Sequence, residues 1–210
     1  TEWGIALLYA STTNGAQNIT IQNNTISLNR TYQNTFGIYS NSTHSATAVA
    51  TSATATTAAG GNENLKVYGN TISNVNMGIV HIGPTAAADQ NTSADIGGTT
   101  ALTGNSISDF GTTTTGLSSY ANLSGTINGI LVRNTRSFNI SRNTVSSSNG
   151  GVVAGTLNGI QVPASSNAPT GTLVQTINNN SISLRPGAIG IAINGINVPS
   201  TSVNATTTFS

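Results

Sequence analysis

Five carboxylates and two histidines are the side chains in this sequence best suited to acid–base or metal chemistry. Glycoside hydrolysis needs two carboxylates facing one bond, and polysaccharide lyases need acidic calcium ligands beside a basic residue. Each carboxylate falls on a different repeat or loop, without an acidic counterpart at strand spacing. We therefore expect no catalytic residue, with a polysaccharide lyase or glycoside hydrolase as the alternative. The seven residues are Glu2, Glu63, Asp89, Asp95, Asp109, His44 and His81.

The histidines and arginines do not indicate a metal site or a nucleic-acid-binding site. The chain has no Cys, and neither His has a neighbouring His or carboxylate to complete a zinc site. By strand alternation His81 falls on an apolar face, where we expect a locally hydrogen-bonded side chain or a bulge. Arg133, Arg136 and Arg142 lie close in sequence, but nucleic-acid binding needs a basic stripe and several aromatic residues, and Phe138 is the one aromatic among them. We expect no metal, no cofactor and no nucleic-acid partner.

The dominant pattern is a five-fold repeat of Asn-Thr/Ser-Ile/Val-Ser. An apolar residue precedes each Asn by three positions, and another, expected to form a core column, follows it by two. Recurrence at intervals of 35 to 46 residues is typical of a solenoid, whose units bury their apolar faces against one another. The asparagines are Asn24, Asn70, Asn105, Asn143 and Asn180; the preceding residues are Ile21, Val67, Leu102, Ile140 and Ile177; the core column is Ile26, Ile72, Ile107, Val145 and Ile182.

A Gly-Ile pair between successive repeats completes the unit. One rung is then an apolar-x-apolar strand, a bend at the Asn, a short strand through the core residue, a variable loop and a Gly-Ile-x-apolar strand. Period-two alternation predicts one dry and one wet face for every strand. We expect Asn at the bend because it tolerates left-handed backbone and its amides can bond between rungs about 4.8 Å apart. Gly marks corners where a Cβ would clash or φ is positive. The pairs begin at Gly4, Gly37, Gly78, Gly129, Gly159 and Gly190.

A repeating hydroxyl face flanks the expected core column. Thr or Ser stands on both sides of each core residue, so two parallel columns should line one flat face. Small hydroxylic residues suit strands and keep such a face soluble. The alternative is an ordered-water surface, similar to the Thr-x-Thr faces of ice-binding β-solenoids, although the second column here is entirely Ser. The residues are Thr25, Ser27, Thr71, Ser73, Ser106, Ser108, Thr144, Ser146, Ser181 and Ser183.

The framed repeat resembles the coil of right-handed parallel β-helix proteins of the pectate-lyase-like superfamily. Residues 18–27 (NITIQNNTIS), 64–73 (NLKVYGNTIS) and 138–146 (FNISRNTVS) carry the resemblance. It covers nearly the whole chain and implies an all-β, right-handed parallel β-helix of about five rungs with loop insertions. The segment 95–108 is similar to stretches of large secreted, adhesin-like surface proteins of Bacteroidota, which implies export by type IX secretion.

Composition agrees with an extracellular scaffold. Charged residues make up 5% of the chain, against about 25% in ordinary soluble domains, and the formal net charge is +1. We interpret residues 1–210 as a single β-helix segment, an excerpt of a longer repeat protein that is secreted or on the cell surface. No apolar run approaches a membrane span. Expected partners are flanking repeats or capping domains of the same chain, secretion machinery, cell-surface proteins or glycans.

These observations favour a non-catalytic structural or adhesive segment. The alternative is a carbohydrate-binding or carbohydrate-active β-helix with aromatic residues in its groove. Three insertions, residues 43–61, 84–99 and 111–126, interrupt the repeat as loops, where specific function normally resides. The candidate groove aromatics are Trp3, Tyr32, Tyr39, Tyr68 and Tyr120.

Overall fold

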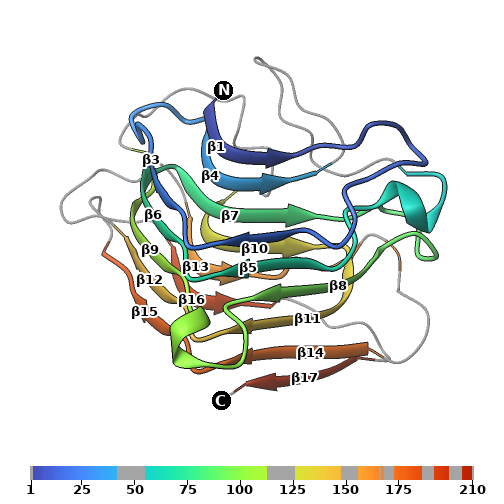
Figure 1. Cartoon of the computed structure of the whole chain (residues 1–210). Coiled ribbons are helices and arrows are strands. Elements are labelled where there is room, and N and C mark those ends of the chain that lie inside the picture. Colours follow the sequence, from blue (N-terminus) through green and yellow to red (C-terminus); the bar gives the residue numbers. More distant parts are fainter. Residues whose placement is uncertain are drawn as a thin grey trace.

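The computed structural model describes residues 2–41, 55–112, 126–147, 156–165, 167, 173–185, 192–198 and 205–209. Their strands form three parallel sheets of six, six and five strands, and each strand pairs with its counterpart one rung away (Figure 1). The described ranges contain no α-helix, and their helical turns are the short 3-10 elements η1 (Ala58–Gly60) and η2 (Ala101–Thr103). The predicted parallel β-helix of about five rungs is confirmed.

Each rung passes through the three sheets in the same order. Sheet 2 leads into the Asn bend, sheet 3 follows the bend, and a loop leads to sheet 1. Sheet 1 contains β1 (Glu2–Leu7), β4 (Thr35–Ser40), β7 (Met77–Ile82), β10 (Ile127–Arg133), β13 (Leu157–Gln161) and β16 (Ile193–Asn197). Sheet 2 contains β2 (Thr20–Gln22), β5 (Leu65–Tyr68), β8 (Asn91–Ile96), β11 (Thr135–Ser141), β14 (Leu173–Asn178) and β17 (Ala205–Phe209). Sheet 3 contains β3 (Thr25–Ser27), β6 (Thr71–Val75), β9 (Ser106–Phe110), β12 (Thr144–Ser147) and β15 (Ser181–Ser183).

The apolar residues of sheet 3 lie in one register. Ile26 pairs with Ile72, Ile72 with Ile107, Ile107 with Val145, and Val145 with Ile182. The first four are buried and belong to one continuous hydrophobic core, and Ile182 is half-buried against it. The structure therefore stacks the expected core column.

Glycines of sheet 1 make room for that column. A Cβ on Gly78 would lie 2.5 Å from the carbonyl oxygen of Gly129 and 2.7 Å from Cγ2 of Ile107. Both contacts are too close for any side chain, and the φ of Gly78 is not positive. These glycines lie inside strands and not at corners, so the steric half of our expectation holds and the corner assignment is wrong. The other members that face the column in the same way are Gly4, Gly37, Gly129 and Gly159.

The sixth Gly-Ile pair differs from the one expected. Gly190 and its Ile neighbour lie outside the described residues, and β16 carries Gly195-Ile196 instead. Ile196 pairs with Ile160 of β13, so this second pair occupies the repeat position. The sequence feature that identifies this pair as the repeat member is the preceding Asn, because Asn-Gly-Ile also occurs in β10 and β13.

Sheet 1 departs from the expected alternation of dry and wet faces. Every residue of β4 and β7 is buried, including the polar Ser40 and His81 at their carboxyl ends. Sheets 2 and 3 do alternate, as in β2 and β3, where one buried Ile lies between two exposed residues. A parallel sheet covered on both faces loses the period-two signal. The inner strands β4, β7, β10 and β13 behave in this way, whereas the end strands β1 and β16 are partly exposed.

The third rung contains a longer bend than the repeat predicts. Leu102 was expected in the core, but it lies in η2 and is 92% exposed. Ile96 of β8 takes its place, paired with Val67 and Ile140 in sheet 2. Gly97 and Gly98 have φ values of 101° and 64°, which only Gly adopts readily, and they lead the chain out of the rung before it returns at the ladder Asn.

The insertions differ in kind. The segment 84–99 is not purely a loop, because it contains β8, a central strand of sheet 2. Within 43–61, residues 43–54 lie outside the described ranges, and residues 55–61 contain η1. Within 111–126, residues 113–125 also lie outside them.

Candidate functional site

The five repeat asparagines form a continuous ladder at the bend between sheets 2 and 3. In each step, the backbone N–H and the side-chain Nδ2 of one Asn donate to Oδ1 of the next, at 2.8–3.2 Å. The Nδ2 of Asn105 also donates to the carbonyl of Val67, 2.9 Å away. Asn105 thus uses both amide hydrogens and accepts two hydrogen bonds while only 2% exposed. Full pairing is what makes a buried amide favourable.

The left-handed backbone at this bend belongs to the residue before the ladder Asn. Asn23, Arg142 and Asn179 have φ values of 56°, 62° and 52°, and Gly69 has 61°. The ladder asparagines are not among the residues with positive φ. Our expectation of left-handed backbone at the ladder position is therefore wrong by one residue, because the amide must point along the stack while its neighbour turns the chain.

A second row of asparagines was missed by sequence reasoning. In sheet 1, Asn158 donates to Oδ1 of Asn128 at 2.9 Å, and Asn194 donates to Oδ1 of Asn158 at 2.8 Å. Asn128 and Asn158 are fully buried. Each precedes the Gly of a Gly-Ile pair, so the Asn-Gly-Ile triplet was the available signal.

The hydroxyl face of sheet 3 has one regular column and one interrupted column. In the first, residues 25, 71, 106, 144 and 181 are all exposed and pair in register. In the second, Ser27, Ser73 and Ser108 pair in sequence, but the register shifts between β9 and β12. Ser147 consequently pairs with Phe110.

Asp95 is the most connected carboxylate on the outer face of sheet 2. Its Oδ2 accepts from the Tyr68 hydroxyl at 2.6 Å, and its Oδ1 accepts from Nδ2 of Asn139 at 2.7 Å and from the Gly98 N–H at 3.1 Å. Burial raises the pKa of Tyr68, and the Asp95 hydrogen bond and charge add to that rise. These donors fix the carboxylate between three rungs.

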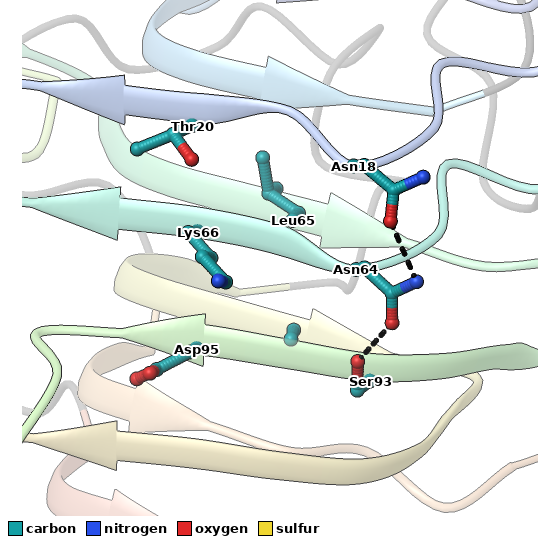
Figure 2. A pocket seen from close by; sticks show the side chains of 8 residues that line it. Asn18, Thr20, Asn64, Leu65, Lys66, Ser93 and Asp95 are labelled. Atoms are coloured by element: carbon teal, nitrogen blue, oxygen red, sulfur yellow. Dashed lines mark hydrogen bonds between the residues drawn. The ribbon is translucent and has the colours of Figure 1, made fainter.

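A surface hollow of about 290 Å³ lies beside Asp95 on β2, β5 and β8 (Figure 2). Lys66 and Asp95 come from paired positions on neighbouring strands. Along the other side, Nδ2 of Asn64 donates to Asn18 Oδ1 at 3.0 Å, and the Ser93 hydroxyl donates to Asn64 Oδ1 at 2.5 Å. The hollow therefore combines an exposed ammonium, a fixed carboxylate, amides and hydroxyls. Its lining residues are Asn18, Thr20, Asn64, Leu65, Lys66, Ser93, Ala94 and Asp95.

His81 belongs to a buried polar chain at the carboxyl ends of the sheet 1 strands. Its Nε2 accepts from Nδ2 of Asn91 at 2.9 Å, so its Nδ1–H donates to the Ser40 hydroxyl at 3.0 Å. Nδ2 of Asn62 donates to the same hydroxyl at 3.0 Å. A Ser–His contact activates serine nucleophiles, but Ser40 and His81 are both fully buried, so no substrate reaches them. Burial lowers the pKa of His81 to about 4.

The structure separates the remaining carboxylates. Glu2 lies in β1, Glu63 is buried before β5, and Asp89 precedes β8. Asp109 is exposed and has a φ of 50°, matching Asn74 at 55° in the same place one rung earlier. Asp109 therefore serves a left-handed bend.

The candidate groove aromatics and the arginines are dispersed. Tyr39 is fully buried, and its ring stacks on Trp3 with centroids 6.4 Å apart. Tyr32 is 58% exposed, while Tyr120 and His44 lie outside the described residues. Phe138 is in the core, and Arg136 donates to the carbonyls of Ala87 and Ala88.

The described ranges hold no group of three or more His, Asp or Glu side chains arranged to bind a metal. They also hold no helix with the length and apolarity needed to cross a bilayer. Comparison with protein-family models, with curated proteins and with solved structures gives no match for this chain.

Proposed function

We propose that this chain is a non-catalytic structural and adhesive segment of a secreted cell-surface protein. One observation carries the proposal: the recurring residues of each rung are used in contacts between rungs. The ladder Asn bonds to the next Asn, the sheet 1 Gly admits the core residue, and the core residue stacks on its counterpart. When the recurring Asn, Gly and aliphatic residues of a unit are used for stacking, its function lies in its length and in the loops that it displays.

The scaffold proposal is tested by activity and location together. The purified chain is incubated with a panel of polysaccharides and assayed for new reducing ends and unsaturated products. An antibody against the chain is applied to intact and lysed source cells. We expect no depolymerisation and labelling of intact cells. Product release, or labelling confined to lysed cells, contradicts the proposal.

The proposal also includes the family relationship and the export route that the sequence resemblances imply. We infer a relationship to the coils of pectate-lyase-like β-helices and a Bacteroidota surface protein exported by type IX secretion. The parallel sheets and the Asn bend support the first inference, and the similarity of the sequence 95–108 to stretches of such surface proteins supports the second. Loss of the chain from the cell surface when the type IX machinery is inactivated tests the export route; retention there refutes it.

A second candidate function is glycan binding at the hollow beside Asp95. The observation that favours it is the combination of Lys66, the fixed Asp95 carboxylate and exposed amides in about 290 Å³, near the lower end of ligand-site volumes of about 300–1,000 Å³. A glycan array tests it with wild type, Lys66→Ala, Asp95→Asn and the remote control Asp109→Asn. Binding that Lys66→Ala and Asp95→Asn lose and the control keeps supports this function, and an array without signal excludes it for the glycans displayed.

A further inference from the structure

Two buried side-chain oxygens without a hydrogen-bond donor both lie close to Gly61. Oδ1 of Asn91 lies 2.5 Å, and Oε1 of Glu63 lies 3.3 Å, from the position that a Cβ on Gly61 would take. The carbonyl oxygen of Ala58, which accepts from the Gly61 N–H at 3.1 Å and keeps a second lone pair, lies 3.4 Å from the same position. The three nearest atoms beyond the chain neighbours of Gly61 are therefore all oxygens. We call this group of three oxygens around Gly61 the Gly61 notch.

The charge of Glu63 is not balanced by a basic residue in the described part of the chain. Its Oε2 accepts from the N–H and the hydroxyl of Thr92, at 2.6 and 2.5 Å, which leaves Oε1 for the notch. Glu63 is 6% exposed and Asn91 is fully buried. Both ring nitrogens of His81 are occupied by other groups, Nε2 by Nδ2 of Asn91 and Nδ1 by the Ser40 hydroxyl. Buried carboxylates are normally paired with a cation or coordinate a metal, because an isolated charge is costly to bury.

We propose that the Gly61 notch binds a hard metal cation through Glu63 Oε1, Asn91 Oδ1 and the Ala58 carbonyl. Carboxylate, amide and carbonyl oxygens are the ligands that Ca²⁺ takes, with water completing its shell. A single carboxylate balances a monovalent ion such as Na⁺ fully and a divalent ion by half. A set made of oxygen ligands alone suits such a hard cation better than a transition metal, which prefers imidazole or thiolate ligands.

The proposed cation joins two rungs. Ala58 begins η1 and Gly61 directly follows it, in the segment after β4, while Asn91 begins β8 of the next rung. Glu63 leads into β5 between them. Binding would therefore stabilise the stack at a place where polar side chains, and not an aliphatic column, connect successive coils.

The test measures urea unfolding of the 210-residue chain at constant ionic strength in choline chloride, CaCl₂ or NaCl. A cation at 100 times its Kd lowers the unfolding equilibrium constant about 100-fold. Glu63→Gln removes the charge but keeps an acceptor for Thr92. Gly61→Ala places a Cβ 2.5 Å from Asn91 Oδ1 and so displaces one of the proposed ligands, while its φ of −82° is open to Ala. Asp109→Asn is the matched control, with the same change of charge at an exposed site whose φ Asn tolerates.

We expect wild type and Asp109→Asn to gain stability with CaCl₂ or NaCl, and Glu63→Gln and Gly61→Ala to gain none. The two salt arms identify the ion. Wild type that unfolds identically in all three salts overturns the proposal: the oxygens then share a water, or the Asn91 amide is inverted with Nδ2 toward Glu63. Equal gains in all four proteins also overturn it, because the cation then binds elsewhere. If Glu63→Gln does not fold, the proposal is tested by comparing the salt-dependent gain in stability of wild type with that of Gly61→Ala.

Discussion

Replacing Gly78 with Ala tests whether the sheet 1 glycines exist to admit the core column. The added Cβ would meet the Gly129 carbonyl at 2.5 Å and Cγ2 of Ile107 at 2.7 Å. The first contact is with the backbone of a neighbouring strand, which cannot rotate away as a side chain can. The φ of Gly78 is not positive, so the effect is steric and not conformational.

The expected loss follows from that geometry. Overpacking a core typically costs about 1–3 kcal/mol, and a clash with backbone belongs at the upper end. We therefore expect Gly78→Ala to lower the free energy of unfolding by about 3 kcal/mol, a large part of the roughly 5–15 kcal/mol that stabilises a domain. With a urea m value of about 2 kcal/mol/M, the midpoint falls by roughly 1.5 M.

Gly195 provides the matched control. It occupies the same repeat position in β16, but a Cβ there meets no atom within 4 Å. Gly195→Ala should gain about 0.4–1 kcal/mol, because Ala reduces the entropy of the unfolded chain. Urea unfolding followed by circular dichroism compares both variants with wild type. Equal midpoints for Gly78→Ala and Gly195→Ala refute the argument that the core column requires these glycines.

Three further outcomes are expected. Asn105→Ala should cost about 3 kcal/mol in urea unfolding, because it leaves buried donors without acceptors, while Asn24→Ala at the half-exposed end of the ladder should cost about 1 kcal/mol; equal costs contradict a cooperative ladder. The free energy of unfolding should fall by about 3 kcal/mol between pH 6.5 and pH 4. In that range His81 becomes protonated in the unfolded chain, whereas in the folded chain its pKa is lowered to about 4 and it stays neutral. A urea midpoint that does not change across this range refutes the prediction. Ile96→Ala should cost about 2–5 kcal/mol and Leu102→Ser less than about 0.5 kcal/mol in thermal unfolding, and the reverse order contradicts the assignment of the third rung.

The sequence predicts the fold well because one physical demand recurs in every rung. The ladder Asn and the core residue two positions later keep a fixed spacing, since the bend between sheets 2 and 3 is short. Where the bend lengthens, the apolar residue that ends the sheet 2 strand no longer stands three positions before the Asn. Leu102 stands at the expected distance from Asn105, yet the turn at Gly97 and Gly98 moves it to the surface, and Ile96 enters the core.

The buried polar contacts were less accessible to sequence reasoning. Asn62 and Asn91 follow variable segments and have no repeated frame, yet they reach Ser40 and His81 across the rungs. Glu63 reads as a loop residue in the sequence and is 6% exposed in the structure. Periodicity identifies residues that recur, whereas such contacts arise once, from the path of an individual insertion.

The Asn ladder also gives the β-helix a polarity along its axis. From Asn24 to Asn180, every hydrogen bond from one ladder Asn to the next is donated in the same sense, toward the carboxyl end of the chain. The other Nδ2 hydrogen of the later members is donated to a carbonyl of the preceding rung. The two ends of the row are thus unlike, one suited to receive hydrogens and the other to give them. A coil added to the row, from this chain or from another copy, would find complementary groups only if it ran in the same direction, so an assembly along this axis would have to be head-to-tail.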